Sequence, residues 1–399
     1  MSAVQSSKNV PYLKAMTVAG IMSGTSADGI DLAFVRIRPS ADGLKLKLLA
    51  HHAVPFSKSL RAAVLRAMDA QAISTAELAR LNWRLGIAYC EALKEALRLH
   101  PGKIDLVGCH GQTIYHQGIA SEFAGKKFAC TWQIGEMAML AEESGVPVVS
   151  NFRSADMVAG GQGAPLVSLL DFVMFRHRER GRVLQNLGGI GNLTAIPPSG
   201  SLEDLVAFDT GPANMVMDVL TATLFGKPYD RGGRIAARGN VLSEVVESVL
   251  RQRYFALKPP KSAGREEFGE RFAADFLERC RAAGGRPEDA VATAAALTAR
   301  TVAMAYERFV RPMMGDAPVD YLLSGGGALN PTLTEMLRRE LVPLGCKVDS
   351  TARLGLPTQA KEAAAFALMA YETWHRRPGN VPAATGARRP AILGTITYA

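Results

Sequence analysis

A mixed α/β fold in two halves is the architecture that the sequence predicts. Strand-like and helix-like segments alternate along the chain, and such alternation is typical of sheets covered by helices. One plan, a strand followed by a glycine-rich loop and another strand, begins at Met16 and again at Arg182. Glycine loops also follow apolar strands at residues 24–29, 188–191 and 325–327. Because ligands of open α/β sheets bind beyond the strand ends, we expect two lobes around a central cleft, each contributing a phosphate loop.

The first half contains the clearest helix signal. A strand from Met16 precedes expected strands at residues 30–38 and 44–54. The stretch at residues 74–102 opens with a capping box, Ser74 and Glu77, and closes on Pro-Gly, which predicts one long helix. After it we expect a buried strand at 105–111, a helix at 136–144 and a strand at 146–150. This alternation predicts a largely parallel sheet.

The second half restarts at Arg182 with a strand, a glycine loop and a strand. Residues 205–218 then predict a strand, a turn and a helix, and helices dominate residues 240–313. A buried strand, a glycine loop and a helix start follow at residues 321–331. The last long helix is expected at about residues 357–374.

Domain boundaries follow from this plan. We expect a first lobe at residues 1–152 together with a C-terminal helix at about 357–377. The second lobe would be residues 153–356, and residues 378–399 would form a C-terminal tail. No Pro/Ser-rich linker separates the halves, so residues 151–166 are the most plausible crossing.

Composition favours a soluble cytoplasmic protein. The 399 residues are 48% hydrophobic and 21% charged, which permits a sizeable core and excludes a disordered chain. The five cysteines are scattered and lack CxxC spacing, as in a reducing compartment. Neither a signal peptide nor an apolar run of membrane-spanning length is visible.

The net charge of +9 does not by itself indicate nucleic-acid binding. The basic residues are dispersed and mixed with acidic ones, whereas nucleic-acid binders gather them in a patch or stripe. A basic surface also suits a small anionic substrate, because positive potential raises the local concentration of anions.

The first glycine loop, within "GIMSGTSADGIDLAFVRI", is too polar for a simple hairpin. Hydroxyl groups and carboxylates are the side chains that handle phosphate and its metal, and glycine lets a backbone approach a ligand. The polar side chains of this loop are Ser23, Thr25, Ser26, Asp28 and Asp31. A turn decorated with ordinary turn residues is the alternative.

Asp209, in "FDTGPAN", is the carboxylate that the pattern singles out. It ends an apolar strand before a helix start, where a carboxylate can activate water or a hydroxyl while backbone N–H groups hold an anion. The alternative is a helix N-cap. Neither a P-loop nor a dinucleotide GxGxxG motif after a strand is present.

Six motifs together resemble one family. "MSGTSADGID", "CHGQTIYH", "NLGGIGNLT", "FDTGPANMVMD", "SGGGALNP" and "KEAAAFALMA" occur in the order and approximate spacing of anhydro-N-acetylmuramic acid kinases. The closing "TGARRPAILGTI" is similar to the tail of that family, so the resemblance runs from about Ala19 to the C-terminus. It implies the actin-like ATPase (ribonuclease H-like) fold, in agreement with the two-half plan.

The resemblance implies a reaction in peptidoglycan recycling: ATP, water and 1,6-anhydro-N-acetylmuramic acid give N-acetylmuramic acid 6-phosphate and ADP. Asp209 would be the general base, and Gln112, Thr113, Arg153 and Glu362 would contact the substrate, with Glu362 near the sugar or the metal. The nucleotide-binding residues would be Gly24, Thr25, Ser26, Ala27, Asp28, Gly29, Ile30, Asp31, Gly188, Gly189, Gly191, Gly325, Gly326 and Gly327. The cofactors would be ATP and Mg²⁺, the latter held through water by Asp28 and Asp31. A homodimer is also suggested by the resemblance.

Two positions depart from the family pattern. Ala27 stands where the family usually has Leu, which indicates a packing difference beside the loop. Leu329 occupies a position that is often polar or basic, which bears on any adenine contact there.

Two other functions fit the same scaffold. One is an actin-fold kinase that phosphorylates an ordinary sugar hydroxyl, with Asp209 taking that proton. The other is a non-catalytic sugar or nucleotide sensor, although a repressor-type sensor would need a DNA-binding extension longer than residues 1–15.

Four further features can be interpreted as functional or as purely structural. Cys109, His110 and His116 lack a second ligand pair at zinc spacing. Trp132 is as consistent with a ring that stacks on a sugar as with a core residue. The charged loop at 259–269 is a substrate or hinge loop, or simply solvated, and Lys361 with Glu362 could be a surface pair.

Overall fold

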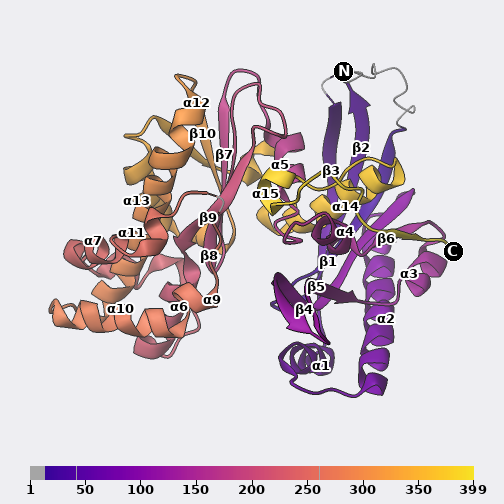
Figure 1. The fold of residues 1–399 in the computed structure, drawn as a ribbon, viewed down its shortest axis with the longest axis horizontal. Helices are drawn as coiled ribbons and strands as arrows, with labels where there is room; N and C mark the ends of the chain where they lie inside the picture. Colours follow the sequence, from indigo (N-terminus) through magenta and orange to yellow (C-terminus); the bar gives the residue numbers. More distant parts are fainter. Residues whose placement is uncertain (1–13, 42, 260) are drawn as a thin grey trace. The chain divides into compact units, whose positions relative to one another are not determined.

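The computed structural model describes residues 14–41, 43–259 and 261–399, and these divide into two compact units (Figure 1). Unit 1 runs to Met174 and resumes at Gly355, and unit 2 is Phe175–Leu354. The polar start of the chain, residues 1–13, lies outside the described residues. The stretches 153–174 and 378–399 therefore belong to unit 1, whereas the sequence assigns them to the second lobe and to a separate tail.

A buried carboxylate explains this difference in boundaries. Asp156, on α4 (Phe152–Val158), is completely buried. Its Oδ1 atom accepts hydrogen bonds from Asn380 and from the Thr385 hydroxyl, both at 2.7 Å. Because a buried carboxylate needs such partners, the C-terminal stretch is fixed to α4.

Unit 1 is built on a mixed sheet. Its order in the described part of the chain is β12-β6-β4-β1-β2-β3, and β5 pairs with the far part of β4. Strands β1, β2 and β3 form an antiparallel meander, whereas β4 and β6 run parallel to β1. The strands are β1 (Met16–Ser23), β2 (Gly29–Ser40), β3 (Gly43–Pro55), β4 (Leu106–Phe123), β5 (Lys126–Ile134), β6 (Val148–Ser150) and β12 (Thr395–Thr397).

The long predicted helix of unit 1 is confirmed as α2 (Thr75–Leu99). The Ser74 hydroxyl accepts the Glu77 N–H at 3.2 Å, so the predicted cap starts this helix. Leu81, Leu85 and Ala92 lie on its buried face at helical spacing. The other helices are α1 (Lys58–Asp69), α3 (Met137–Ser144), α4, α5 (Ser168–Phe175), η6 (Thr358–Ala360), α14 (Lys361–Trp374) and α15 (Pro382–Thr385).

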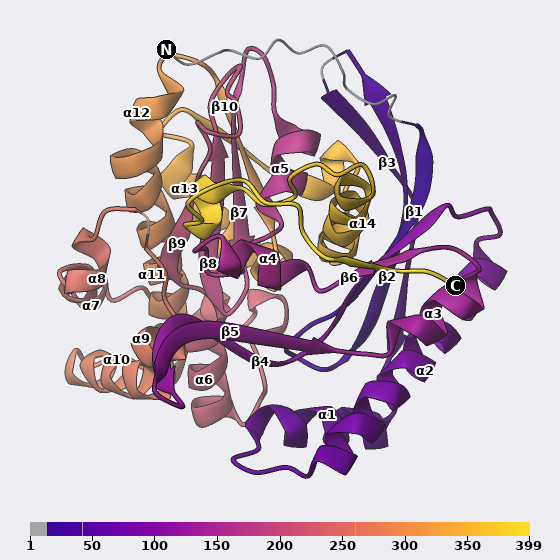
Figure 2. The ribbon, with the colours of Figure 1, turned by 45° about the vertical axis from the view of Figure 1, so that its right-hand side comes forward.

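Helix α14 packs directly on the sheet of unit 1 (Figure 2). A Cβ atom on Gly20 of β1 would lie 1.8 Å from the Ala363 carbonyl oxygen. One on Gly108 of β4 would lie 2.4 Å from the Phe366 carbonyl oxygen. Only glycine at these two positions permits so close an approach, and it brings the start of α14 next to the first glycine loop.

Unit 2 repeats the strand order of unit 1. Its sheet is ordered β11-β10-β7-β8-β9, which corresponds to β6-β4-β1-β2-β3. Strands β7, β8 and β9 again form an antiparallel meander, and β10 and β11 run parallel to β7. The strands are β7 (Gly181–Leu187), β8 (Ile190–Ile196), β9 (Val206–Pro212), β10 (Val319–Ser324) and β11 (Cys346–Ser350).

Most helices of unit 2 come between β9 and β10 in the sequence. The helix α11 is rich in alanine and is buried along most of its length. The helices are α6 (Asn214–Phe225), η1 (Arg231–Gly233), η2 (Ala236–Arg238), α7 (Ser243–Leu250), α8 (Arg253–Ala256), α9 (Arg265–Phe268), α10 (Glu270–Ala282), α11 (Pro287–Ala305), η3 (Tyr306–Val310), α12 (Arg311–Met314), η4 (Gly326–Leu329), α13 (Pro331–Leu341) and η5 (Thr351–Leu354).

The α/β class and the repeated plan are thus confirmed, but the prediction of a largely parallel sheet is wrong. Each glycine loop that joins β1 to β2, or β7 to β8, is short, and a short loop connects antiparallel neighbours. Each sheet therefore mixes a meander with parallel strands. Among the described residues, we find no helix of a length and hydrophobicity that would cross a bilayer.

Candidate active site

Asp209 lies within β9, at the edge of the unit 2 sheet. The pairing with β8 slips here: Gly191 pairs with Gly211 and Asn192 pairs with Asp209, so Thr210 is an extra residue. Such a bulge re-aims neighbouring side chains and is frequent beside active sites. The N-cap alternative is wrong, because Ala213 is the residue that precedes α6.

Residues on either side of position 260, within 254–259 and 261–263, hold Asp209 in place. The Tyr254 hydroxyl donates to the Asp209 carbonyl oxygen at 2.8 Å, and the Asp209 N–H donates to the Lys261 carbonyl oxygen at 3.0 Å. The Ala263 N–H donates to Oδ2 of Asp209 at 2.8 Å. Within the described residues Oδ1 has no hydrogen-bond partner, so one oxygen is anchored and the other is available.

The environment of Asp209 suits a general base. Burial raises its pKa to about 6, and the charge of Glu267 acts in the same direction. The Ala263 hydrogen bond and the charge of Lys261 oppose this increase. With a pKa near 6 the carboxylate is mostly ionised at neutral pH, yet it is more basic than an exposed aspartate.

The glycine loops of unit 2 meet at the carboxyl ends of β7 and β10. A Cβ atom on Gly325 would lie 2.7 Å from the Leu187 carbonyl group, and the φ angle of Gly325 is +84°. A Cβ atom on Gly327 would lie 2.8 Å from the Leu187 Cβ. These two glycines therefore permit close packing of the 325–327 loop against Leu187 at the end of β7, next to the 188–191 loop, whereas Gly326 has only the Asn214 side chain near it.

The start of α6 does not offer free N–H groups to an anion. The Gly189 carbonyl oxygen accepts the N–H groups of Ala213 and Met215 at 3.0 and 3.1 Å. The Gly188 carbonyl oxygen accepts the Asn214 N–H at 2.9 Å. The expectation that backbone N–H groups beside Asp209 hold an anion is therefore wrong for these three residues, because the glycine loop itself uses them.

A pocket of about 360 Å³ adjoins the 325–327 loop and the start of α6. Asp218 lies in it, and burial raises the pKa of this carboxyl group to about 6. Leu329, one of the two departures from the family pattern, also lines it and is 69% exposed. The other lining residues are Asn214, Met217, Tyr229, Asp230, Gly232, Gly326 and Asn330.

In unit 1, the predicted phosphate loop is an exposed turn between β1 and β2. Thr25, Ser26 and Asp28 are exposed, while Ala27 is buried with a left-handed φ angle of +50°. The Ser26 hydroxyl donates to Oδ1 of Asp28 at 2.8 Å. Glycine at position 29 permits close contact with β3, because a Cβ atom there would lie 2.5 Å from the Val54 carbonyl oxygen.

Gln112 and Thr113 lie next to this loop. The Gln112 amide donates to the Gly24 carbonyl oxygen at 3.0 Å, while its Oε1 atom is buried without a hydrogen-bond partner among the described residues. The Thr113 hydroxyl accepts a hydrogen bond from Gln133 at 3.2 Å. Gln112 thus stabilises the loop through its hydrogen bond to the Gly24 backbone.

Arg153 is held by His110. Its Nε–H donates to Nε2 of His110 at 2.9 Å, and Nη1 donates to the Gly163 carbonyl oxygen at 2.6 Å. Since Nε2 accepts this bond, Nδ1 of His110 carries the proton that goes to the Gly111 carbonyl oxygen at 2.7 Å. Burial and the charge of Arg153 hold the pKa of His110 well below its usual value, so the imidazole is neutral.

Glu362, in the first turn of α14, shares this charged environment. Its side chain reaches solvent, yet desolvation by the surrounding protein raises its pKa, as does the charge of Asp31. Arg153 and Lys361 oppose this shift. Lys361 itself is buried and forms an ion pair with Asp171 at 2.8 Å, so the hypothesis of a surface pair with Glu362 is wrong.

Asp31 and Asp28 each use one carboxylate oxygen. Oδ1 of Asp31 lies 2.9 Å from Nε2 of His51, and Oδ1 of Asp28 accepts from Ser26. The second oxygen of each is without a hydrogen-bond partner in the described part of the chain. Across residues 14–41, 43–259 and 261–399, no group of three or more His, Cys, Asp or Glu side chains is arranged to hold a metal directly.

All the site residues described above fall within the part of the chain that matches one protein family. The profile of the family "Anhydro-N-acetylmuramic acid kinase" matches residues 16–399. The chain belongs to this kinase family.

Curated members of the family match nearly full length. The anhydro-N-acetylmuramic acid kinase of Bacillus cereus (strain AH187) is 42% identical over 386 residues, which are 96% of this chain and 99% of that protein. The one from Bacillus thuringiensis (strain Al Hakam) is 41% identical over 386 residues, 96% of this chain and 98% of that protein. Among solved structures, the activator of the 2-hydroxyisocaproyl-CoA dehydratase from Clostridium difficile aligns at 14% identity with a TM-score of 0.41, over 90% of this chain and 95% of that chain.

The residues around Asp209 are the ones that the sequence does not reveal. Tyr254, Lys261 and Ala263 lie about fifty residues downstream, in or beside the charged loop at 259–269, of which residue 260 lies outside the described residues. The charges of that loop are consistent with solvation as well as with function. Its contact with Asp209 becomes visible only in the folded unit.

Proposed function

We propose that this chain catalyses the ATP-dependent conversion of 1,6-anhydro-N-acetylmuramic acid and water into N-acetylmuramic acid 6-phosphate and ADP, in the cytoplasm. The family match over residues 16–399 supports the reaction. The single observation that supports its chemistry is Asp209, a partly buried carboxylate with one oxygen anchored and a pKa of about 6.

The reaction needs only one carboxylate as a base. Hydrolysis of a glycosidic bond usually takes two carboxyl groups, one to activate water and one to protonate the leaving oxygen. In this reaction the leaving oxygen, O6, takes the γ-phosphoryl group of ATP in place of a proton. Asp209 accepts a proton from water, the water oxygen forms a bond to C1, the C1–O6 bond breaks and O6 attacks the γ-phosphorus as ADP leaves.

The remaining residues bind and orient. We assign the nucleotide to the loops at 24–31, 188–191 and 325–327, and its adenosine part to the pocket beside Asn214 and Gly326. Arg153 and Glu362 are assigned to the sugar, whose lactyl carboxylate is anionic and suits a guanidinium partner. Gln112 and Thr113 are assigned to the same substrate, and the homodimer remains a prediction.

Asp28 and Asp31 fit a magnesium ion held through water. Each has one carboxylate oxygen outside the hydrogen bonds of the described residues, and Mg²⁺ commonly keeps several waters while binding one or two carboxylates and the phosphates. When bound, the ion neutralises charge on the transferred phosphoryl group.

The reaction is tested by incubating the protein with Mg-ATP and the anhydro sugar in ¹⁸O-water. The proposal predicts label at C1 of the product and none in the phosphate. Ordinary N-acetylmuramic acid serves as the comparison substrate. Phosphorylation of an unopened sugar, or of the ordinary sugar at an equal rate without label at C1, would support the alternative kinase and contradict the proposal.

A further inference from the structure

We propose that Lys261 is a positioning residue for Asp209: its ammonium group, held among three aromatic rings, fixes the backbone segment that aims the carboxylate and places a positive charge near it. This inference rests on the proposed function only in giving Asp209 the role of base.

Three aromatic rings lie close to the ammonium group. Nζ of Lys261 lies 4.6 Å from the ring centre of Tyr254, 5.5 Å from that of Phe309 and 6.0 Å from that of Phe208. These distances are those of cation–π contacts. Nζ also donates to the Tyr254 carbonyl oxygen at 3.4 Å.

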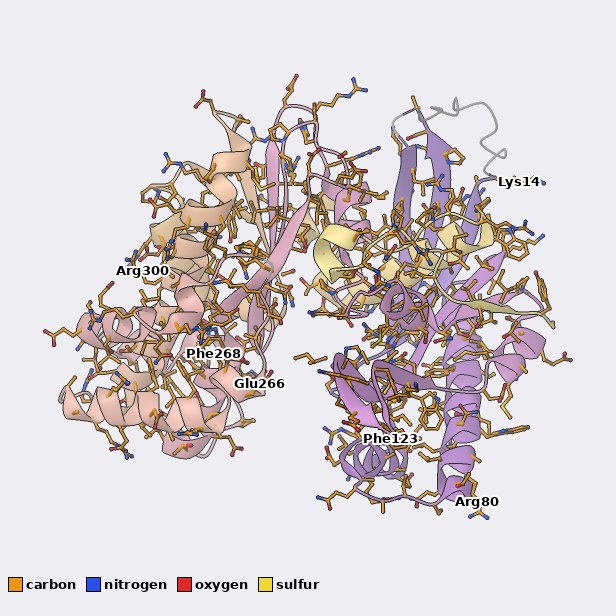
Figure 3. All side chains as sticks on the ribbon, viewed as in Figure 1. Lys14, Arg80, Phe123, Glu266, Phe268 and Arg300 are labelled. Carbon is orange, nitrogen blue, oxygen red and sulfur yellow. The ribbon has the colours of Figure 1, made fainter. Side chains whose placement is uncertain are left out.

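Other contacts hold the aromatic rings near Lys261 in place. The Tyr254 ring packs edge-on against Phe268, which Figure 3 labels on α9, with ring centres 5.1 Å apart. The Tyr254 hydroxyl donates to the Asp209 carbonyl oxygen, and Phe208 is the neighbour of Asp209 on β9. Lys261 therefore contacts Tyr254 through its ammonium group and Asp209 through its backbone, and Tyr254 in turn contacts Asp209.

The backbone carries this restraint to the carboxylate. The Lys261 carbonyl oxygen pairs with the Asp209 N–H, and two residues further on the Ala263 N–H holds Oδ2. Fixing the side chain of Lys261 at one end thus restrains both hydrogen bonds. Oδ1 is left in one orientation, as a base needs if it is to meet a water at a defined position.

The charges around this pair come from several elements. Glu267 on α9 favours the neutral form of Asp209, whereas Lys261 favours the ionised form. Burial, together with the positive charge of Arg308 on η3, lowers the pKa of Lys261 to about 8. Between about pH 6 and pH 8, Asp209 is therefore mostly ionised while Lys261 is still mostly protonated.

The experiment compares Lys261→Met, which keeps the stem and removes the charge, with Lys261→Arg, which keeps the charge. Lys258→Met, in the same segment but exposed, is the matched control. The pH profile of kcat/KM is measured for each. We expect Lys261→Met to move the acid limb upward by about one pH unit, since a nearby opposite charge lowers a carboxyl pKa by that order. Lys261→Arg and Lys258→Met should keep the wild-type limb.

A second readout needs no turnover. In protein labelled with ¹³C at the aspartate carboxyl carbon, the Asp209 signal, assigned by its loss in Asp209→Asn, should titrate at higher pH in Lys261→Met. This shift without the expected sugar chemistry would refute the proposed function but not the role of Lys261. If Lys261→Met is poorly folded, Lys261→Gln takes its place.

The inference fails if the carbon titration of Lys261→Met equals that of the wild type. It also fails if the rate falls equally at every pH and Lys261→Arg does not restore it, because that is the behaviour of a merely structural side chain.

Discussion

The two units share one strand order but place their charged groups differently. In unit 1 the charges gather at the start of α14, where Lys361 pairs with Asp171 and Glu362 lies near Arg153 and Asp31. In unit 2, Asp209 lies on the edge strand β9, and hydrogen bonds from Tyr254 and Ala263 hold it. The repeated sheet thus provides a scaffold, while these hydrogen bonds and this ion pair come from residues outside its strands.

The two carboxyl groups illustrate the difference. Desolvation raises the pKa of both Asp209 and Glu362. Glu362 has two cations close by, Arg153 and Lys361, whereas Asp209 has Lys261 and a backbone N–H on one oxygen. A carboxylate beside two cations is suited to binding, and one with a single free oxygen is suited to accepting a proton.

The largest expected effect separates these two roles. Asp209→Asn should lower kcat by about 10²- to 10⁴-fold, the usual contribution of a general base, with nucleotide affinity nearly unchanged. Steady-state kinetics and calorimetric titration with ATP measure the two quantities. Asp275→Asn, at an exposed position on α10, is the control. A near-normal kcat in Asp209→Asn would show that the base lies elsewhere.

A stability measurement tests the charged cluster of unit 1. Lys361→Met should lower the free energy of unfolding by about 3–5 kcal/mol, because it breaks a buried ion pair by removing the cation that lies 2.8 Å from the Asp171 carboxylate. Urea denaturation, followed by circular dichroism, measures this. Lys94→Met removes an exposed ion pair with Glu143 and should change stability little. Equal midpoints for the two variants would mean that the Lys361 pair is not a stabilising contact.

The smallest of the three effects concerns Glu362. Glu362→Gln should lower kcat/KM for the sugar by about 10- to 100-fold, as expected for the loss of one hydrogen bond to a charged group. Most of this change should appear in KM, since the residue is assigned to binding. Glu91→Gln, exposed on α2, serves for comparison. A loss in kcat as large as that of Asp209→Asn would remove the distinction between the two carboxyl groups.

Local signals made much of the fold predictable. Ser74 starts α2, the glycine loops join the strands of each meander, and apolar runs mark β10 and α14. Such signals act through backbone hydrogen bonds and side-chain periodicity over a few residues, so they can be read in order along the chain. Sheet direction could not be read in this way, because a strand pattern does not say which neighbour it pairs with.

The sequence by itself determined the α/β class, the repeated plan, the family and the choice of Asp209. Only the tertiary structure decided which groups surround that aspartate, that Lys361 is buried against Asp171, and that His110 holds Arg153. These partners are 54, 190 and 43 residues apart. Contacts over such separations depend on how helices and strands pack, and packing is set by the whole unit rather than by neighbours in the chain.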